Sequence, residues 1–287
     1  MFGKTCLLIP LACLLALPAR AGYQFFKAPV AKSTWKVQAT PIICRLRHSI
    51  PLYGEAEFVR RAKTDLEFSM HVKQAANRPE SARLFSLAPE WKHIAIARDF
   101  GSIPVVKGKE PFYLNGTWAK RMAAELEEGM DLQFIYRDWM DGSDEITVTV
   151  MPVNFLKAWG GFQKCEKQLL NIRFADVRKT IIQYGMGKIA LDRGTQRRLD
   201  QMIHYMKVDS SVRRVRIDGY TDSKGLERIN LVVARRRTNV VRDYFIKHGI
   251  DKNRISPHAH NELEGKFSNR TAAGRKKNRR VEVMLIR

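Results

Sequence analysis

The sequence has few of the residue clusters on which catalysis and metal binding depend. It contains seven histidines and four cysteines in 287 residues, and His48, His71 and His93 lack the spacing of a metal site. Serines and histidines are scattered, without the sharp turn that presents a serine nucleophile. The acidic residues of one loop do not match a calcium-binding pattern; they are Asp138, Asp141, Asp144 and Glu145. These absences disfavour an enzyme, a metalloprotein and a calcium-binding protein, and we expect no cofactor.

Long hydrophobic runs are also absent, apart from one at the start of the chain. Lys4 precedes an apolar segment over residues 6–17, and residues 19–21 form an A-x-A cleavage site. The apolar segment is shorter than the roughly 20 residues that a membrane-spanning helix needs. We therefore predict a secretory signal peptide over residues 1–21 and no transmembrane segment in the mature chain. Lipoprotein processing at Cys13 is a weaker alternative, because it would leave too short an apolar run.

Acidic residues are outnumbered by basic ones. The chain has 51 Lys and Arg against 29 Asp and Glu, a formal net charge of +22. Loss of Lys4 and Arg20 with the signal peptide would leave +20. For a cytosolic protein this charge would indicate nucleic acid. For an exported protein the expected partners are the anionic cell wall, anionic lipid surfaces or acidic proteins. The alternative is that the basic residues form only a solvent-exposed surface and bind no partner.

Cysteine is scarce in the mature chain. Cys6 and Cys13 belong to the predicted signal peptide, so only Cys44 and Cys165 remain. An even pair in an oxidising compartment favours a disulfide. We predict this disulfide between Cys44 and Cys165, with two buried free thiols as the alternative.

Residues 22–165 are predicted to form a β-rich domain. Apolar and polar residues alternate in short runs between turns rich in glycine and proline. The runs are residues 35–39, 56–59, 66–70, 134–136 and 146–150. One helix is predicted from Trp118 to Glu128, capped by Asn115 or Thr117, because Trp118 and Met122 share one face with Leu126. The pattern predicts an antiparallel sandwich or a barrel-like domain.

Residues 166–287 show an alternation of strands and helices. Strands are predicted over residues 177–184, 215–219, 255–259 and 280–286. Thr195 is expected to cap a helix, whose apolar stripe is Leu199, Met202, Ile203 and Met206. A second helix, over residues 226–248, ends at Gly249. The order β-α-β-α-β-β predicts an α+β sandwich with helices on one face of a mixed sheet.

The second helix combines an apolar stripe with one inward arginine. The stripe consists of Ile229, Val233, Val240, Val241 and Tyr244. Arg237 lies four residues after Val233, and a guanidinium on the inward side needs a partner. Asp222, in the turn before the helix, is the candidate. Two interpretations remain open: a structural Asp–Arg pair, or a carboxylate and a guanidinium that face one cleft and bind a zwitterion.

The stretch from Val215 to Arg280 resembles the OmpA-like peptidoglycan-binding domain. The matching residues are Gly219-Tyr-Thr-Asp222, Asn230, Val233-Ala-Arg-Arg-Arg237, Asn269-Arg-Thr271, Gly274-Arg275 and Asn278-Arg-Arg-Val-Glu282. The resemblance implies that Asp222 and Arg237 hold the diaminopimelate of the wall stem peptide. It assigns supporting contacts to Asn230 and Arg279, and Thr221 lies in the same turn. The sequence departs from the family pattern at Tyr220, at residues 233–234 and over residues 258–265.

The first half resembles the MotY family, periplasmic components of the sodium-driven polar flagellar motor. The matching residues are Trp35, Thr40-Pro41, Cys44, His48, Ile50-Pro51, Gly54, Phe58, Arg61-Ala62, Glu125-Leu126-Glu127, Tyr136-Arg-Asp-Trp139 and Cys165. This resemblance covers essentially the whole mature chain. It implies docking of the first half on the basal-body ring, together with a MotX-like partner, and a role in holding stator units. It also implies a disulfide between the two cysteines.

These expectations together describe a non-enzymatic periplasmic anchor. Residues 22–165 would dock on the flagellar basal body near the outer membrane, and residues 166–287 would bind peptidoglycan. Binding is expected rather than catalysis, because no nucleophile is paired with a base. The alternative is a general wall-anchoring envelope protein that is not dedicated to motility.

Overall fold

The computed structural model describes residues 22–140, 142–260 and 266–287 of the chain. The predicted signal peptide therefore lies outside the described residues, as do Asp141 and part of the divergent loop. Contacts divide the chain into two compact units. The N-terminal unit comprises residues 22–36, 47–58 and 67–158, and the C-terminal unit comprises residues 37–46, 59–66 and 159–287. The domain boundary expected between residues 165 and 166 stays a prediction.

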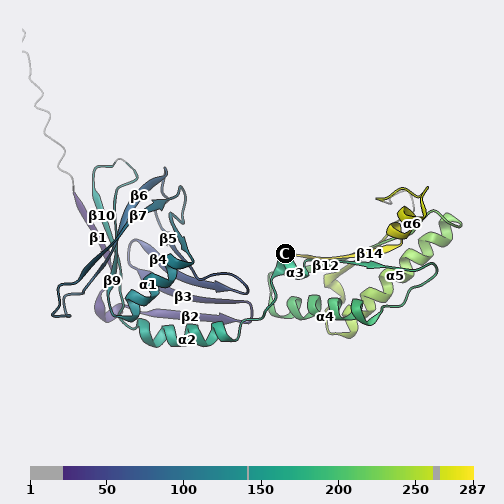
Figure 1. Ribbon diagram of the computed structural model, residues 1–287, viewed down its shortest axis with the longest axis horizontal. Helices are drawn as coiled ribbons and strands as arrows, with labels where there is room; N and C mark the ends of the chain where they lie inside the picture. Colours follow the sequence, from purple (N-terminus) through teal and green to yellow (C-terminus); the bar gives the residue numbers. More distant parts are fainter. Residues whose placement is uncertain (1–21, 141, 261–265) are drawn as a thin grey trace, which may run out of the picture. The chain divides into compact units, whose positions relative to one another are not determined.

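The first part of the chain is mostly β-structure (Figure 1). Its strands are β1 (Tyr23–Lys27), β2 (Trp35–Thr40), β3 (Ile43–Ile50), β4 (Gly54–Arg61), β5 (Glu67–Val72), β6 (Glu80–Leu87), β7 (Ala97–Val105), β8 (Phe112–Asn115), β9 (Asp131–Arg137) and β10 (Glu145–Val150). They form two five-stranded sheets, in the orders β1-β10-β9-β6-β7 and β2-β3-β4-β5-β8. The expected mostly-β architecture is confirmed. It is not wholly antiparallel, because β1 pairs with β10 in parallel.

Aromatic residues fill the space between the two sheets of the N-terminal unit. Phe58 and Phe68 belong to one sheet and Phe134 to the other, and all three are fully buried. The rings of Phe68 and Phe134 stack with centroids 5.8 Å apart, and Phe112 lies 5.1 Å from Phe134. Each buried ring removes a large apolar area from water. The apolar residues of the alternating pattern in the two sheets therefore face each other and form one hydrophobic core.

The first helix, α1 (Thr117–Glu127), matches the predicted helix but not its predicted cap. The residue before the helix is Gly116, at φ +55°, and it makes no side-chain capping bond. Asn115 still belongs to strand β8 and Thr117 is already helical. The chain turns into the helix through a left-handed conformation that glycine adopts at little cost. The expected cap at Asn115 or Thr117 is therefore wrong.

A second helix, α2 (Phe155–Lys167), was not predicted. Two consecutive glycines, Gly160 and Gly161, lie in its middle, and each costs a helix about 1 kcal/mol relative to alanine. Packing outweighs this penalty, because one face of the helix is buried. That face consists of Phe155, Trp159, Phe162 and Cys165. The expectation of a single helix in the first half is wrong.

The predicted disulfide is present. Cys44 on β3 and Cys165 on α2 are bonded, with their Cα atoms 5.9 Å apart. The bond joins residues separated by 121 positions in the chain. It therefore connects the start of β3 to the last turn of the helix that follows the β-rich region.

The second part of the chain alternates helices and strands (Figure 1). The elements are α3 (Phe174–Val177), β11 (Lys179–Gln183), α4 (Arg193–Val208), β12 (Arg214–Tyr220), α5 (Glu227–Lys247), β13 (Ile255–Ala259), α6 (Ala272–Asn278) and β14 (Arg280–Ile286). The sheet order is β11-β14-β12-β13. β12 is parallel to β13 and antiparallel to β14, so the sheet is mixed. Helices α4 and α5 lie on one face, and the predicted α+β sandwich is confirmed.

Two short helices extend the predicted order of elements. The strand expected over residues 177–184 is shorter, because the one-turn helix α3 precedes it. Helix α6 carries no apolar stripe and was not predicted. Its N-cap is Thr271, whose Oγ1 accepts a hydrogen bond from the backbone N–H of Gly274 at 3.0 Å. A capped but polar segment is difficult to recognise from hydrophobic periodicity alone.

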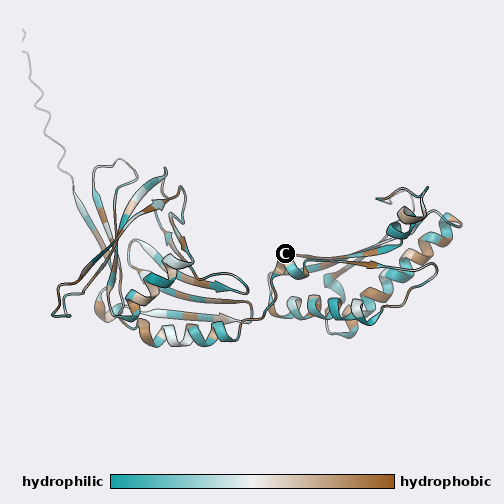
Figure 2. Cartoon of the chain, viewed as in Figure 1, coloured by the Kyte–Doolittle hydropathy of each residue, from teal (hydrophilic) through white to brown (hydrophobic). Residues whose placement is uncertain are grey.

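The core of the C-terminal unit lies between the sheet and the two long helices. The predicted stripe of α4 is buried as expected, at Leu199, Met202, Ile203 and Met206. Figure 2 shows that α4 and α5 carry hydrophilic as well as hydrophobic residues. The cap of α4 is Asp192, whose carboxylate accepts from the N–H of Thr195 at 2.7 Å. The expected cap at Thr195 is wrong, because that residue lies in the first turn and is buried.

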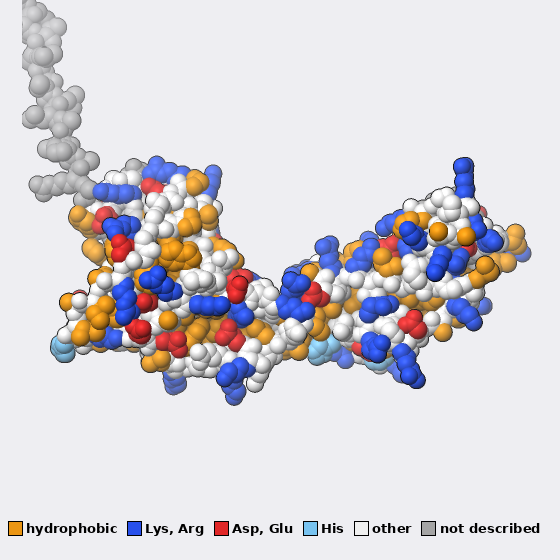
Figure 3. Space-filling view, viewed as in Figure 1, with side chains coloured by type: hydrophobic (Ala, Val, Ile, Leu, Met, Phe, Trp, Pro, Cys, Tyr) orange, Lys and Arg blue, Asp and Glu red, His pale blue; other side chains and the backbone are white. Residues whose placement is uncertain are grey.

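The excess of basic residues is concentrated in the second half of the chain. Residues 166–287 contain 29 Lys and Arg against 13 Asp and Glu, whereas residues 22–165 contain 20 against 16. Figure 3 shows Lys and Arg side chains on the visible face of the C-terminal unit. No helix in the described part of the chain is long and apolar enough to cross a membrane.

Loss of the disulfide is predicted to weaken the fold. Replacing both Cys44 and Cys165 with alanine should lower the free energy of unfolding by about 2–4 kcal/mol, because the unfolded chain regains conformational entropy. Guanidinium unfolding of the oxidised protein and of the double variant measures this difference. Thiol titration of the denatured, unreduced mature protein should find no free thiol. Two free thiols and unchanged stability would contradict the prediction.

Candidate binding pocket

A pocket of ≈ 320 Å³ lies in the C-terminal unit. It is lined by the loop after β11, the turn after β12, the first half of α5 and Arg279, which directly precedes β14. The structure brings together in this pocket all five residues that the sequence assigned to a ligand: Thr221, Asp222, Asn230, Arg237 and Arg279. They come from three separate segments of the chain. The fold therefore assembles the predicted set at one place.

The close approach of α5 to β12 determines the position of Arg237. Gly219, near the end of β12, is covered by the helix. A Cβ atom at this position would lie 2.6 Å from Cγ2 of Thr238 and 2.9 Å from the carbonyl oxygen of Ala234. Only glycine allows the helix to pack this closely on the strand. The close packing aligns Arg237 with the turn that carries Thr221 and Asp222.

Arg237 is held inside the protein by backbone carbonyls. It is 1% exposed. Its Nε donates to the carbonyl oxygen of Lys188 at 3.0 Å and its Nη2 donates to that of Gly185 at 3.2 Å. The guanidinium also lies over the ring of Tyr184, at 4.7 Å from the ring centroid. These contacts fix the plane of the guanidinium before any ligand arrives.

Two buried polar atoms of the pocket have no hydrogen-bond partner among the described residues. They are Nη1 of Arg237 and Oγ1 of Thr221. A buried donor without a partner costs free energy, so such groups are rare in folded proteins. Burial lowers the pKa of Arg237. The pocket therefore holds a cationic donor and a hydroxyl that an acceptor-rich ligand could satisfy.

The carboxylate of Asp222 pairs with Arg279 rather than with Arg237. Nη1 of Arg279 donates to Oδ2 of Asp222 at 2.6 Å. The side-chain amide of Asn230 donates to the backbone carbonyl of Asp222 at 3.0 Å, which fixes the turn on α5. A direct Asp222–Arg237 ion pair, one of the two interpretations left open by the sequence, is therefore not the arrangement in this structure.

The sequence did not identify the loop that receives Arg237. Tyr184, Gly185 and Lys188 contact its guanidinium, and Met186 and Gly187 line the pocket. Burial raises the pKa of Tyr184 to about 12, against an opposing effect of the Arg237 charge. The sequence contains one feature that indicates an irregular turn here, the glycines Gly185 and Gly187. In the structure Gly187 has a φ of +66°, a conformation that favours glycine. Nothing in the pattern indicated that its carbonyls point toward α5.

The inward face of α5 also differs from the predicted stripe. Val241 is buried as expected, but Ile229 is 52% exposed. The buried positions include Asn230, Ala234, Arg237, Thr238, Val241 and Phe245. Polar residues occupy the inward face near the pocket, and apolar residues occupy it farther along. The first half of α5 therefore lines the pocket, and its second half packs in the hydrophobic core.

Comparison with protein families assigns both halves of the chain. The first half matches the family model for the MotY N-terminal domain over residues 26–171, about half of the chain. The chain belongs to the MotY family. A second match, to the OmpA family, covers residues 183–279. All residues that line the pocket fall within this OmpA match.

Individual proteins are similar to most of the chain or to a part of it. A protein of Vibrio parahaemolyticus named sodium-type flagellar protein MotY is 29% identical over 265 residues, which cover 91% of this chain and 90% of the relative. A protein of Mycobacterium bovis named peptidoglycan-binding protein ArfA is 39% identical over 72 residues, 25% of this chain and 22% of the relative. The crystal structure of a peptidoglycan-associated lipoprotein from Burkholderia pseudomallei is similar over 37% of this chain and 89% of that chain, with 20% identity and a TM-score of 0.35.

Proposed function

We propose that this MotY-family protein is a non-enzymatic periplasmic component of the sodium-driven flagellar motor that binds peptidoglycan through the pocket of its C-terminal unit. The observation that carries the proposal is the pair of unsatisfied buried groups, Nη1 of Arg237 and Oγ1 of Thr221, beside the carboxylate of Asp222. Together they offer donors for an anion and an acceptor for a cation within one pocket.

This set of groups suits the diaminopimelate residue of a wall stem peptide. Its free end carries an ammonium and a carboxylate on one carbon. Arg237 and Thr221 can donate to the carboxylate, and a guanidinium is the preferred partner for its planar geometry. Asp222 can accept from the ammonium, because a carboxylate has about four acceptor sites, and Arg279 and the backbone N–H of Lys224 occupy two of them.

Two further residues have supporting roles in this proposal. Arg279 orients the carboxylate of Asp222 through its 2.6 Å bond. Asn230 fixes the backbone of the same turn to α5. Both are expected to act by holding Asp222 in place. The pocket is expected to bind rather than cleave the peptide, because Thr221 is the sole hydroxyl among the described lining residues and no base contacts it.

The N-terminal region is proposed to connect the wall to the motor. Membership of the MotY family supports docking of this region on the basal-body ring, in contact with a MotX-like partner and near the outer membrane. The wall contact would then resist the force that the stator units exert. The Cys44–Cys165 disulfide lies where the β-rich region ends, and both of its cysteines belong to the C-terminal unit.

Sacculus binding is predicted to depend on the pocket. Asp222→Ala and Arg237→Ala should each reduce co-sedimentation of the mature protein with purified sacculi by roughly ten-fold or more, because each removes a charge-assisted contact. Arg235→Ala is the matched control, since this neighbouring arginine on α5 is exposed. Circular dichroism checks that the variants are folded. Undiminished binding by both variants would show that the residues are structural, and release of soluble wall fragments would refute the absence of catalysis.

Localisation is predicted to distinguish a motor component from a general wall anchor. The full chain fused to a periplasm-compatible fluorescent protein should form foci at the flagellated pole. The Asp222→Ala and Arg237→Ala double variant should still reach the pole, because docking is assigned to the N-terminal region. A diffuse signal around the whole cell periphery would support the alternative of an OmpA-like anchor that is not dedicated to motility.

A further inference from the structure

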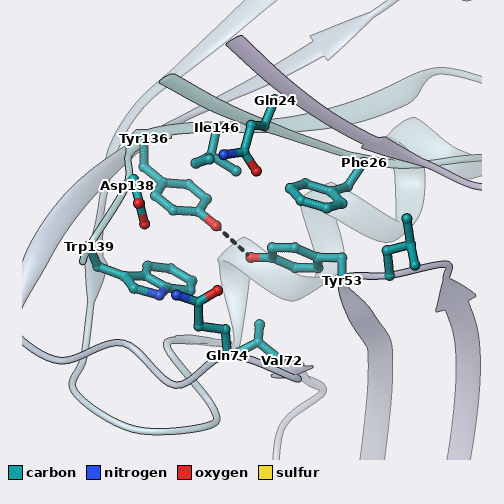
Figure 4. A pocket seen from close by; sticks show the side chains of 10 residues that line it. Gln24, Phe26, Tyr53, Val72, Gln74, Tyr136, Asp138, Trp139 and Ile146 are labelled. Atoms are coloured by element: carbon teal, nitrogen blue, oxygen red, sulfur yellow. Dashed lines mark hydrogen bonds between the residues drawn. The ribbon is translucent and has the colours of Figure 1, made fainter. Parts of the chain in front are cut away.

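A second pocket, of ≈ 90 Å³, lies in the N-terminal unit and shares no lining residue with the pocket around Arg237 (Figure 4). It is enclosed by β1, β9, β10 and the turn between β3 and β4. Its walls are aromatic, formed by Phe26, Tyr53, Tyr136 and Trp139. The last three of these side chains are buried. The pocket is too small for an extended peptide but large enough for the end of a single side chain.

The aromatic walls hold one another in position. The rings of Tyr136 and Trp139 stack with centroids 4.6 Å apart and planes 12° from parallel. Phe26 and Tyr53 lie 5.2 Å apart, and the hydroxyl of Tyr136 donates to that of Tyr53 at 3.2 Å (Figure 4). A binding wall fixed in this way loses little entropy when a ligand enters.

Among the described residues that line the pocket, Asp138 is the one with a formal charge. Its Oδ1 accepts from the backbone N–H of Met140 at 3.1 Å, and it has no ion-pair partner among the described residues. Burial raises the pKa of Tyr53 and of Tyr136, so both phenols remain neutral at physiological pH. The charge of Asp138 adds to the shift at Tyr136. A negative field therefore reaches the aromatic wall.

A second acceptor faces the same pocket. The amide nitrogen of Gln24 donates to Oδ2 of Asp144 at 2.7 Å, which leaves its amide oxygen for another donor. Asp144 also accepts from the backbone N–H of Gly22 at 2.9 Å, so it fixes the start of β1. The acidic loop that the sequence analysis could not assign thus builds the pocket: Asp138 lines it and Asp144 holds its wall.

We infer that this pocket receives a basic side chain, lysine or arginine, from a partner protein. Aromatic rings attract a cation through their negative faces, and Asp138 and Gln24 supply acceptors for its N–H groups. The volume suits an ammonium or guanidinium group. Leu52 also lines the pocket and is 79% exposed, which leaves an apolar side chain available for contact with a partner. An apolar side chain would fit less well, because it would bury the oxygens of Asp138 and Gln24 without donors.

The test is a titration of the mature chain with amino-acid amides, followed through the indole N–H signal of Trp139 by NMR. N-acetyl-arginine amide and N-acetyl-lysine amide should shift this signal saturably, with dissociation constants of about 1–10 mM. The neutral N-acetyl-norleucine amide should bind at least about five-fold more weakly. Equal binding of norleucine amide, or no shift by any probe at about 50 mM, would overturn the inference.

Two variants separate charge from shape in this experiment. Asp138→Asn should weaken the cationic probes about five-fold or more, while its oxygen can still accept from Met140. Asp99→Asn is the control, because this carboxylate is exposed on β7 and does not line the pocket. If Asp138→Asn does not fold, the test uses the unmodified protein at increasing salt concentration. Added salt should then lower the affinity of the cationic probes. Binding that is indifferent to Asp138 and to salt would also overturn the inference.

Discussion

The burial of one guanidinium, that of Arg237, is the constraint on which the pocket of the C-terminal unit depends. An isolated buried charge would destabilise the fold, and the protein offsets this cost with two backbone carbonyls and the ring of Tyr184. Those contacts require the irregular loop after β11 and the close packing of α5 on Gly219. They leave one nitrogen unsatisfied. The arrangement that stabilises the buried Arg237 therefore leaves one N–H donor available for the carboxylate proposed as its ligand.

The fold of the C-terminal unit could be predicted from the sequence because its elements bury clear apolar faces. The stripe of α4 and the alternation of β14 each match a buried surface. Where a local rule competed with packing, the prediction failed. Helix α2 was not predicted because two consecutive glycines lie in its middle, although its buried aromatic face stabilises it. The polar helix α6 has a cap but no apolar face, so its periodicity gave no signal.

The residues of the pocket could be predicted, but their pairing could not. The motif around Asp222 and the inward position of Arg237 indicated a common site, because a guanidinium on a buried helix face is unfavourable unless it has a partner or a ligand. The sequence did not reveal that Arg279 would take the carboxylate of Asp222. That pairing depends on where β14 begins relative to the turn after β12, a tertiary relation with no local pattern. The aromatic pocket was equally hidden, since its walls come from strands far apart in the chain.

The most direct measurement of the central claim is the affinity of the mature chain for two soluble muropeptides that differ in one carboxylate. One carries diaminopimelate at the third position of the stem, and the other carries lysine, which lacks the carboxylate assigned to Arg237 and Thr221. Isothermal titration calorimetry should give an affinity roughly ten-fold or more higher for the diaminopimelate form. Equal affinities, or binding of neither peptide, would contradict the account.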